Sequence, residues 1–100
     1  MPQIYEVTAI VAAHRTVEWE SYMSVIHIPE VLATGCFAAA FFAKDENRYT
    51  IAYHVNTPED LDRYVTEYAV PLRADVLDKF GNDVELSRRT LDIVKLFPGG

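Results

Sequence analysis

A glutamate and two histidines are the residues of this sequence best placed for acid–base chemistry. Glu6 and His54 lie in two segments with strand-like alternation, each on the face opposite a purely apolar stripe. A carboxylate beside an imidazole holds it in one tautomer, so the pair can transfer protons. We expect Thr8 opposite Ala52 and Glu6 opposite His54 when these strands pair. The alternative is a structural pair that fixes the contact between two copies of the chain.

His27 is the second histidine, and it precedes a proline in the stretch HIPEVLATGCF. Proline has no backbone N–H and its ring clashes with the carbonyl group four residues earlier, so a regular helix cannot continue through it. We predict a helix break at Ile28–Pro29, a short helix over 29–33, and a left-handed Gly35 after it. This break would leave His27 beside a cavity, where it transfers a proton or anchors a ligand. Alternatively, His27 caps the last carbonyl groups of the first helix.

The elements that position these residues follow the order β-α-β-β-α-β. Strand patterns and helical patterns alternate along the chain, with strands over 3–12, 36–44, 48–55 and 84–96 and helices over 16–27 and 58–80. Strand–helix–strand connections are right-handed, which puts both helices on one face of the sheet. The predicted fold is therefore ferredoxin-like α+β, a four-stranded antiparallel sheet with strand order 4-1-3-2.

Two irregularities accompany this pattern. In the last strand the apolar positions change from even numbers (Val84, Leu86) to odd numbers (Leu91), which predicts a bulge near Ser87–Arg89. In the second helix, Pro71 predicts a kink.

The predicted sheet has one face without a helical cover. Because the first three strands carry mostly apolar residues on both faces, we expect a second copy of the chain to cover the bare face. Two sheets that meet in this way form a dimeric α+β barrel. An obligate interface of this kind buries on the order of 2,000 Å² or more.

Composition limits the classes of function. One hundred residues suffice for one domain, which we place at 1–97 with a tail at 98–100. The net charge of −6 argues against nucleic acid and membrane partners. The longest apolar run, 36–43, is too short to span a bilayer, and no targeting segment is evident. The lone Cys36 fits a reducing cytoplasm and is better explained as a buried small side chain than as a nucleophile.

Metal and cofactor motifs are missing from the sequence. The three histidines have no metal-ligand spacing, and no phosphate loop or dinucleotide fingerprint occurs, so we expect no metal and no cofactor. Arg73 has no acidic residue one turn away and could bind a carboxylate, although a solvated surface position is the favoured interpretation. The doublet Arg88-Arg89 is interpreted as a solvated strand pair.

Several stretches together resemble one known family: Tyr5 to Val7, HIPEVLATGCF, the third strand with Tyr53, Leu61 to Tyr64, Leu72 to Asp75, and Arg89. This is a family of small bacterial proteins classed as a domain of unknown function, within the dimeric α+β-barrel superfamily. The resemblance covers nearly the whole chain and implies a ferredoxin-like dimer. Relatives in the superfamily include cofactor-free monooxygenases, polyketide cyclases, lactone isomerases and pigment-pathway proteins, which share no single catalytic residue.

We therefore expect a cytoplasmic homodimer that binds an apolar cyclic or aromatic metabolite and assists its rearrangement, cyclisation or condensation. The residues expected to transfer protons are His27, His54 and Glu6. Those expected to contact the ligand are Trp19, Tyr53, Phe37, Phe41 and Thr8, with Phe37 and Phe41 on the same face of the second strand. These aromatic residues could instead belong only to the core and the interface. The alternative functions are a non-catalytic binding or accessory protein and a purely structural dimer.

Overall fold

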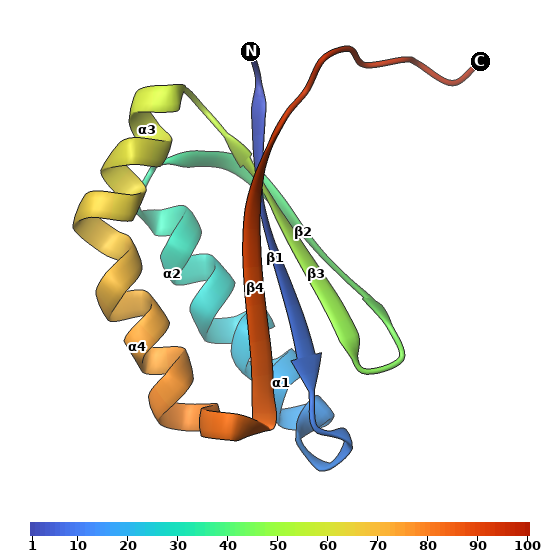
Figure 1. Cartoon of the computed structure of the whole chain (residues 1–100), viewed down its shortest axis with the longest axis vertical. Coiled ribbons are helices and arrows are strands. Elements are labelled where there is room, and N and C mark those ends of the chain that lie inside the picture. Colours follow the sequence, from blue (N-terminus) through green and yellow to red (C-terminus); the bar gives the residue numbers. More distant parts are fainter.

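Four strands form one antiparallel sheet in the order β2-β3-β1-β4 in the computed structural model, which describes residues 1–100 (Figure 1). The strands are β1 (Gln3–Val11), β2 (Phe37–Asp45), β3 (Arg48–Val55) and β4 (Val84–Asp92). From the opposite edge this is the predicted order 4-1-3-2. The ferredoxin-like α+β fold predicted from the sequence is confirmed.

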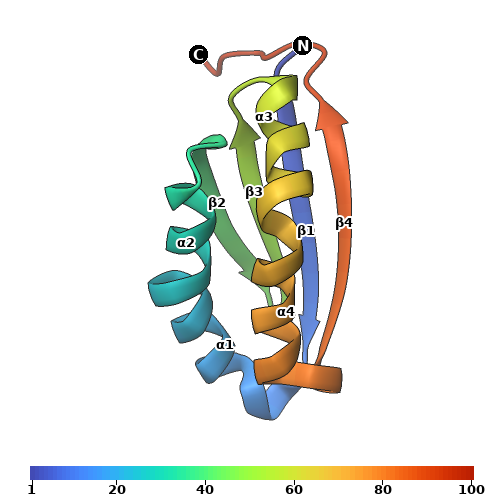
Figure 2. The same cartoon turned by 90° about the vertical axis from the view of Figure 1, so that its left-hand side faces the viewer.

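Two helical crossovers cover one face of the sheet and leave the other face open (Figures 1 and 2). The first comprises η1 (Ala13–Arg15), α1 (Thr16–Tyr22), η2 (Met23–His27) and α2 (Ile28–Ala33). The second comprises α3 (Pro58–Arg63), η3 (Tyr64–Tyr68), α4 (Ala69–Phe80) and η4 (Gly81–Asp83). None of these helices combines the length and the apolar composition that a membrane crossing requires.

The core lies between the crossovers and the sheet. Alternate residues of β1 point into it, so Tyr5, Val7, Ala9 and Val11 are buried while the residues between them are not. Trp19 of α1 is fully buried and packs edge-on against Phe80 of α4, with ring centroids 5.1 Å apart. By the same alternation, the other residues of β1 lie on the open face, and these include the polar residues Glu6 and Thr8.

Each crossover contains one wide π-helical turn shortly before a proline. In the first, the N–H of Ile28 donates to the carbonyl of Met23, five residues earlier, and Pro29 follows. In the second, the N–H of Ala69 donates to the carbonyl of Tyr64, and Pro71 follows. The wide turns accommodate proline rings that would clash in a regular helix.

The predicted helix break at Ile28–Pro29 is therefore wrong. Ile28 has helical dihedral angles (φ −61°, ψ −43°), and helical structure continues to Ala33. The irregularity expected at Pro71 occurs instead in η3, before the proline. Gly35 does take the predicted left-handed conformation, with φ 78°.

The pairing of β1 with β3 differs from the predicted register by two residues. Glu6 lies opposite Ala52, and His54 lies opposite Ile4. A shift of two residues keeps every side chain on its own face, so the alternation of residue types cannot reveal it. Glu6 and His54 share the open face as predicted, but they are not direct cross-strand partners.

A bulge at the start of β2 separates two phenylalanines that we expected on one face. Pairing with β3 passes from Phe37 directly to Ala39, so Ala38 is the extra residue. Phe37 consequently lies in the core, while Phe41 lies on the open face and is 53% exposed. The prediction of a shared face is wrong.

The bulge predicted in β4 is also wrong, because β4 pairs with β1 in unbroken register from Val84 to Asp92. Leu86 packs against the core, and Leu91 lies opposite Ile4 on the open face. The change of apolar phase thus marks a change in which face is apolar. The strand ends at Asp92, short of the predicted Leu96, and the domain boundary placed at 97/98 stays a prediction.

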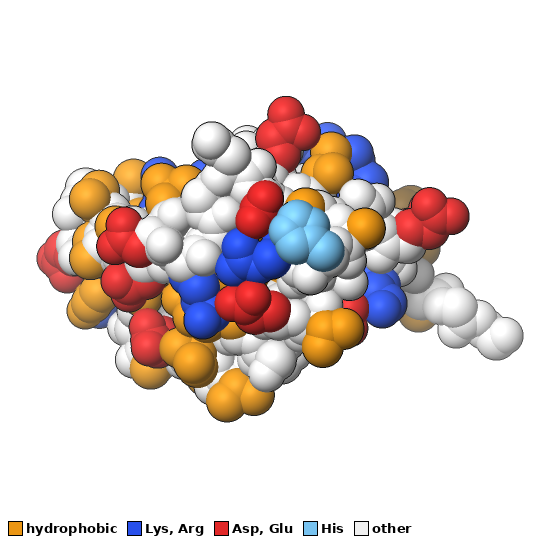
Figure 3. All heavy atoms as spheres, turned by 90° about the horizontal axis from the view of Figure 1, so that it is seen from below, with side chains coloured by type: hydrophobic (Ala, Val, Ile, Leu, Met, Phe, Trp, Pro, Cys, Tyr) orange, Lys and Arg blue, Asp and Glu red, His pale blue; other side chains and the backbone are white.

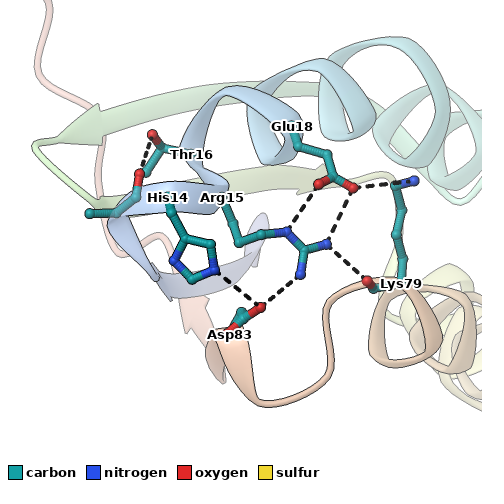
Figure 4. Close-up of polar contacts among 7 residues, drawn as sticks. His14, Arg15, Thr16, Glu18, Lys79 and Asp83 are labelled. Carbon is teal, nitrogen blue, oxygen red and sulfur yellow. Dashed lines mark hydrogen bonds and ion pairs between the residues drawn. The ribbon is translucent and has the colours of Figure 1, made fainter.

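Arg15 links the start of the first crossover to the end of the second at one end of the molecule (Figure 4). Its Nε donates to Glu18 at 3.0 Å, its Nη1 to Asp83 at 2.7 Å, and its Nη2 to the carbonyl of Lys79 at 3.0 Å. The guanidinium also lies 4.7 Å from the centre of the Phe80 ring. Side chains of both charge signs gather over this end (Figure 3). This Arg15 cluster holds the start of the first crossover against the end of the second.

Candidate functional site

A mostly apolar cavity lies between the sheet and the two crossovers, and we call it the core cavity. Side chains from β1, β3, β4 and both crossovers line it. Its walls enclose about 370 Å³ of empty space when the mouth is included, but the centre of a water molecule can reach only about 20 Å³ of this. That is room for one water. A larger ligand therefore requires side chains at the mouth to move.

His27 reaches the core cavity because η2 turns it toward the sheet. It is 9% exposed, and its Nδ1 has no hydrogen-bonding partner. The pKa of His27 is lowered to about 4, mainly by burial and also by the positive charge of Arg88, while the negative charge of Asp75 raises it. His27 is therefore neutral at pH 7. The expectation that it lies beside a cavity is confirmed, although a π-helical turn and not a helix break puts it there.

Three residues that line the core cavity each carry a buried polar atom without a partner: His27 Nδ1, Trp19 Nε1 and Arg73 Nε. Only one other buried side-chain nitrogen or oxygen atom of the chain, Oε1 of Gln3, lacks a hydrogen-bonding partner. Proteins pair the large majority of their buried polar groups, because an unpaired one costs about 1–3 kcal/mol. The unpaired indole and guanidinium N–H groups are donors, so this cavity is suited to a hydrogen-bond acceptor.

An aromatic cluster forms the wall next to the cavity. Tyr5 is stacked with Phe37 at 6.0 Å between ring centroids, and Phe37 lies 5.0 Å from Tyr53 and 4.9 Å from Tyr64. Burial raises the pKa of Tyr64 to about 12 and also raises that of Tyr53, so both hydroxyl groups stay protonated. Of the residues named for ligand contact, Trp19 and Tyr53 line the cavity, and Phe37 packs behind Tyr5 and Tyr53.

The remaining predicted site residues lie on the open face and do not reach this cavity. Glu6 accepts a hydrogen bond at 2.8 Å from the Nε of Arg89, which lies directly opposite it on β4. His54 is exposed, and Thr8 lies opposite Thr50. The predicted Glu6–His54 pairing is absent because the register places Glu6 opposite Ala52 and His54 opposite Ile4, and Glu6 pairs with Arg89 instead. No three side chains of His, Cys, Asp or Glu come together in a possible metal site.

Two arginines that the sequence analysis interpreted as solvated lie at the core cavity, Arg73 on α4 and Arg88 on β4. The alternative that Arg73 binds a carboxylate was noted but not favoured. Arg73 donates from Nη2 to the hydroxyl of Tyr5 at 2.8 Å, so it is not the solvated surface residue that we expected. Arg88 lies opposite Val7, on the helix-covered face. Parity could have placed it there, because positions 84, 86 and 88 of one strand share a face.

Residues 2–94 match the family described as a domain of unknown function, DUF4286. Among curated proteins, no sequence matches the chain at a significant level.

Solved structures with the same fold have very different sequences. A candidate antibiotic biosynthesis monooxygenase from Deinococcus radiodurans is 12% identical, with a TM-score of 0.72 and 98% of each chain covered. A dimeric ferredoxin-like protein from an uncultured marine organism is 12% identical, with a TM-score of 0.69 over 99% of this chain and 100% of that one. A protein of unknown function from Nitrosomonas europaea is 14% identical, with a TM-score of 0.63 over 99% and 98%. Likeness at this level of identity shows the fold alone.

Proposed function

Since the chain belongs to the DUF4286 family of domains of unknown function, we propose a function from its own residues. The core cavity binds an apolar cyclic or aromatic metabolite, and the protein assists a biosynthetic rearrangement, cyclisation or condensation of that ligand. The observation that carries this proposal is that three residues with unpaired buried polar atoms line one cavity with aromatic walls. The structural neighbour described as a candidate antibiotic biosynthesis monooxygenase is compatible with a small-molecule ligand.

In this proposal His27 transfers the proton. As a neutral imidazole at pH 7, it can accept a proton from a carbon next to a ligand carbonyl group. Negative charge then develops on the carbonyl oxygen, and the unpaired indole N–H of Trp19 can donate to it. This charge raises the pKa of His27 and so favours the transfer. Return of the same proton to another ligand atom completes an isomerisation.

The open face serves a different purpose in the same proposal. It is the surface on which two cytoplasmic copies form a homodimer, with the exposed ring of Phe41 and the Glu6–Arg89 pair inside the contact. A solved structure of the same fold is described as dimeric. Glu6 and His54 then stabilise the contact between copies and take no part in proton transfer.

Binding is tested with 2-naphthamide, a neutral bicyclic aromatic compound, added to uniformly ¹⁵N-labelled protein. The chain has a single tryptophan, so one indole N–H resonance reports on the core cavity. We expect this resonance to move saturably. The matched control is Phe41→Ala, which removes a ring from the other face and leaves the titration unchanged. No saturable shift, or a shift abolished by Phe41→Ala, would contradict the proposal.

Proton transfer is tested with 2-tetralone in D₂O at pH 7. If His27 is the base, the protein accelerates exchange of the ketone's α-protons for deuterium, and His27→Gln lowers the rate by about 10²-fold. His54→Gln and Glu6→Gln keep the wild-type rate, because those side chains lie on the other face.

The second candidate function is binding without chemistry. It is favoured by the separation of the predicted acid–base residues, of which only His27 lines the core cavity. Saturable binding of 2-naphthamide together with no acceleration of exchange would support this accessory role over catalysis.

A further inference from the structure

We propose that the ligand of the core cavity is an acid, and that its carboxylate binds between Arg73 and Arg88 at the cavity mouth. This inference rests on the proposed binding function and adds the charge of the ligand. It follows from two guanidinium groups that line the same cavity without an acidic partner.

Arg73 is held in place but is incompletely paired. Its Nη2 donates to the Tyr5 hydroxyl at 2.8 Å, which fixes the side chain against the aromatic cluster. Its Nε is buried and has no partner. A guanidinium carries five N–H donors in a planar fork that matches the two oxygens of a carboxylate. The free Nε–H is thus available to an acceptor that enters the cavity.

Arg88 supplies a second positive charge from the opposite wall. It is the arginine of β4 that faces the helices, whereas its neighbour Arg89 faces the open side and pairs with Glu6. Arg88 is exposed, so its long side chain can move with an arriving ligand. Its charge already influences the inner side chains, since it lowers the pKa of His27.

The two charges are not compensated within the chain. Every ion pair of the protein involves other residues, although the net charge is −6 and acidic side chains outnumber basic ones. In such an acidic chain, two arginines without carboxylate partners at one cavity mouth indicate that the missing anion comes from outside. The apolar walls behind them select an acid with an aromatic or cyclic body.

The test compares 2-naphthoate with 2-naphthamide, two probes of nearly the same shape that differ in charge. Both are titrated at pH 7 into ¹⁵N-labelled protein, with the Trp19 indole resonance as the readout. We expect 2-naphthoate to bind about tenfold more tightly, as a hydrogen-bonded charge pair warrants. Arg88→Gln should remove most of this preference, and because the side chain is exposed the variant should fold. Arg73→Gln should do the same, with a further loss from the Tyr5 contact.

The matched control is Arg48→Gln, which removes an exposed and unpaired arginine from the open face. It should keep the full preference for the acid. Equal affinities for the two probes would overturn this inference and leave the proposed binding function standing. Binding of neither probe would overturn both. A preference that survives in Arg88→Gln and Arg73→Gln but is lost in Arg48→Gln would also overturn it, because the anion would then bind elsewhere.

Discussion

The polar groups on the two faces of the sheet differ in whether they have hydrogen-bonding partners or contact with solvent. On the helix-covered face, Trp19, His27 and Arg73 hold buried polar atoms that pair with nothing. On the open face, Glu6 and Arg89 pair with each other at 2.8 Å and the other polar side chains reach solvent. Unpaired groups are costly where burial is deep and cheap where water is available.

The difference indicates which face recognises a ligand. An exposed polar pair is explained by solubility or by contact with a second copy, so the open face needs no small molecule. Unpaired groups around a cavity destabilise the folded chain unless a ligand or a water satisfies them. The four predictions that follow test this contrast.

The largest effect is expected from Trp19→Ala. Trp19 is fully buried among aromatic rings, so the substitution should lower the free energy of unfolding by about 3–5 kcal/mol. Phe41→Ala, which removes a half-exposed ring from the open face, should cost less than about 1 kcal/mol in the isolated chain. Urea denaturation followed by circular dichroism measures both. Similar decreases in the free energy of unfolding for the two variants would contradict the difference between the two faces.

The second effect is a loss of stability in mild acid. His27 has a pKa of about 4 in the folded chain and 6.5 as its ordinary value, so below pH 6.5 the unfolded chain gains a proton that the folded chain does not. Stability should therefore fall from pH 6.5 toward pH 4, by about 3 kcal/mol in total. The carboxyl groups of Glu18 and Glu20, whose pKa values are lowered, contribute only below about pH 4.5.

Urea midpoints measured between pH 7 and pH 4.5 check this prediction. In His27→Gln the dependence on pH should flatten within that interval. A variant that keeps the wild-type slope would show that another group is responsible.

The third effect concerns association. If the open face joins two copies, Phe41→Asp places a charge in an apolar contact and should raise the dimer dissociation constant on the order of tenfold or more. Sedimentation equilibrium of the wild type and the variant measures it. Val17→Asp, on the exposed side of α1, is the control and should leave association unchanged. A wild type that is monomeric at micromolar concentration would refute the dimer itself.

The smallest effect is expected from Arg89→Ala. Its pair with Glu6 is exposed, because the arginine side chain is 66% accessible, so the loss in the isolated chain should be below about 1 kcal/mol. The same substitution should weaken association more than it weakens folding. A decrease of several kcal/mol in the free energy of unfolding would mean that polar pairs contribute as much to stability on the open face as on the covered one.

The fold was predictable from sequence because it depends on alternation and order. The purely apolar stripe of β1 identifies its covered face, the turn residues before Arg48 identify the hairpin, and the order of the elements then gives the topology. Register was not predictable, since shifts by two residues preserve every face and only the three-dimensional fit distinguishes them.

The candidate site was predictable only in part. His27 and Trp19 were named, but Arg88 was judged by its charged neighbour Arg89 and not by the strand face that it occupies. The wide turn of η2 also has no clear local signal, because Pro29 predicts a disturbance without specifying whether the helix breaks or widens. The bulge at Ala38, which puts Phe37 and Phe41 on opposite faces of β2, likewise has no clear signal in the local sequence.

The two π-helical turns also bear on how chains of this fold can differ in length. Such a turn holds one residue more than an α-helix needs. Deleting a residue within Met23–His27 or within Tyr64–Tyr68, together with replacement of the proline that follows, would therefore leave a regular helix with its flanking turns in their present directions. Chains one residue shorter in either crossover therefore fit the same sheet. In the first crossover, a shorter chain would no longer place His27 at the core cavity. The presence of the extra residue in a related sequence would therefore indicate a buried imidazole, and its absence would indicate a chain that shares only the fold.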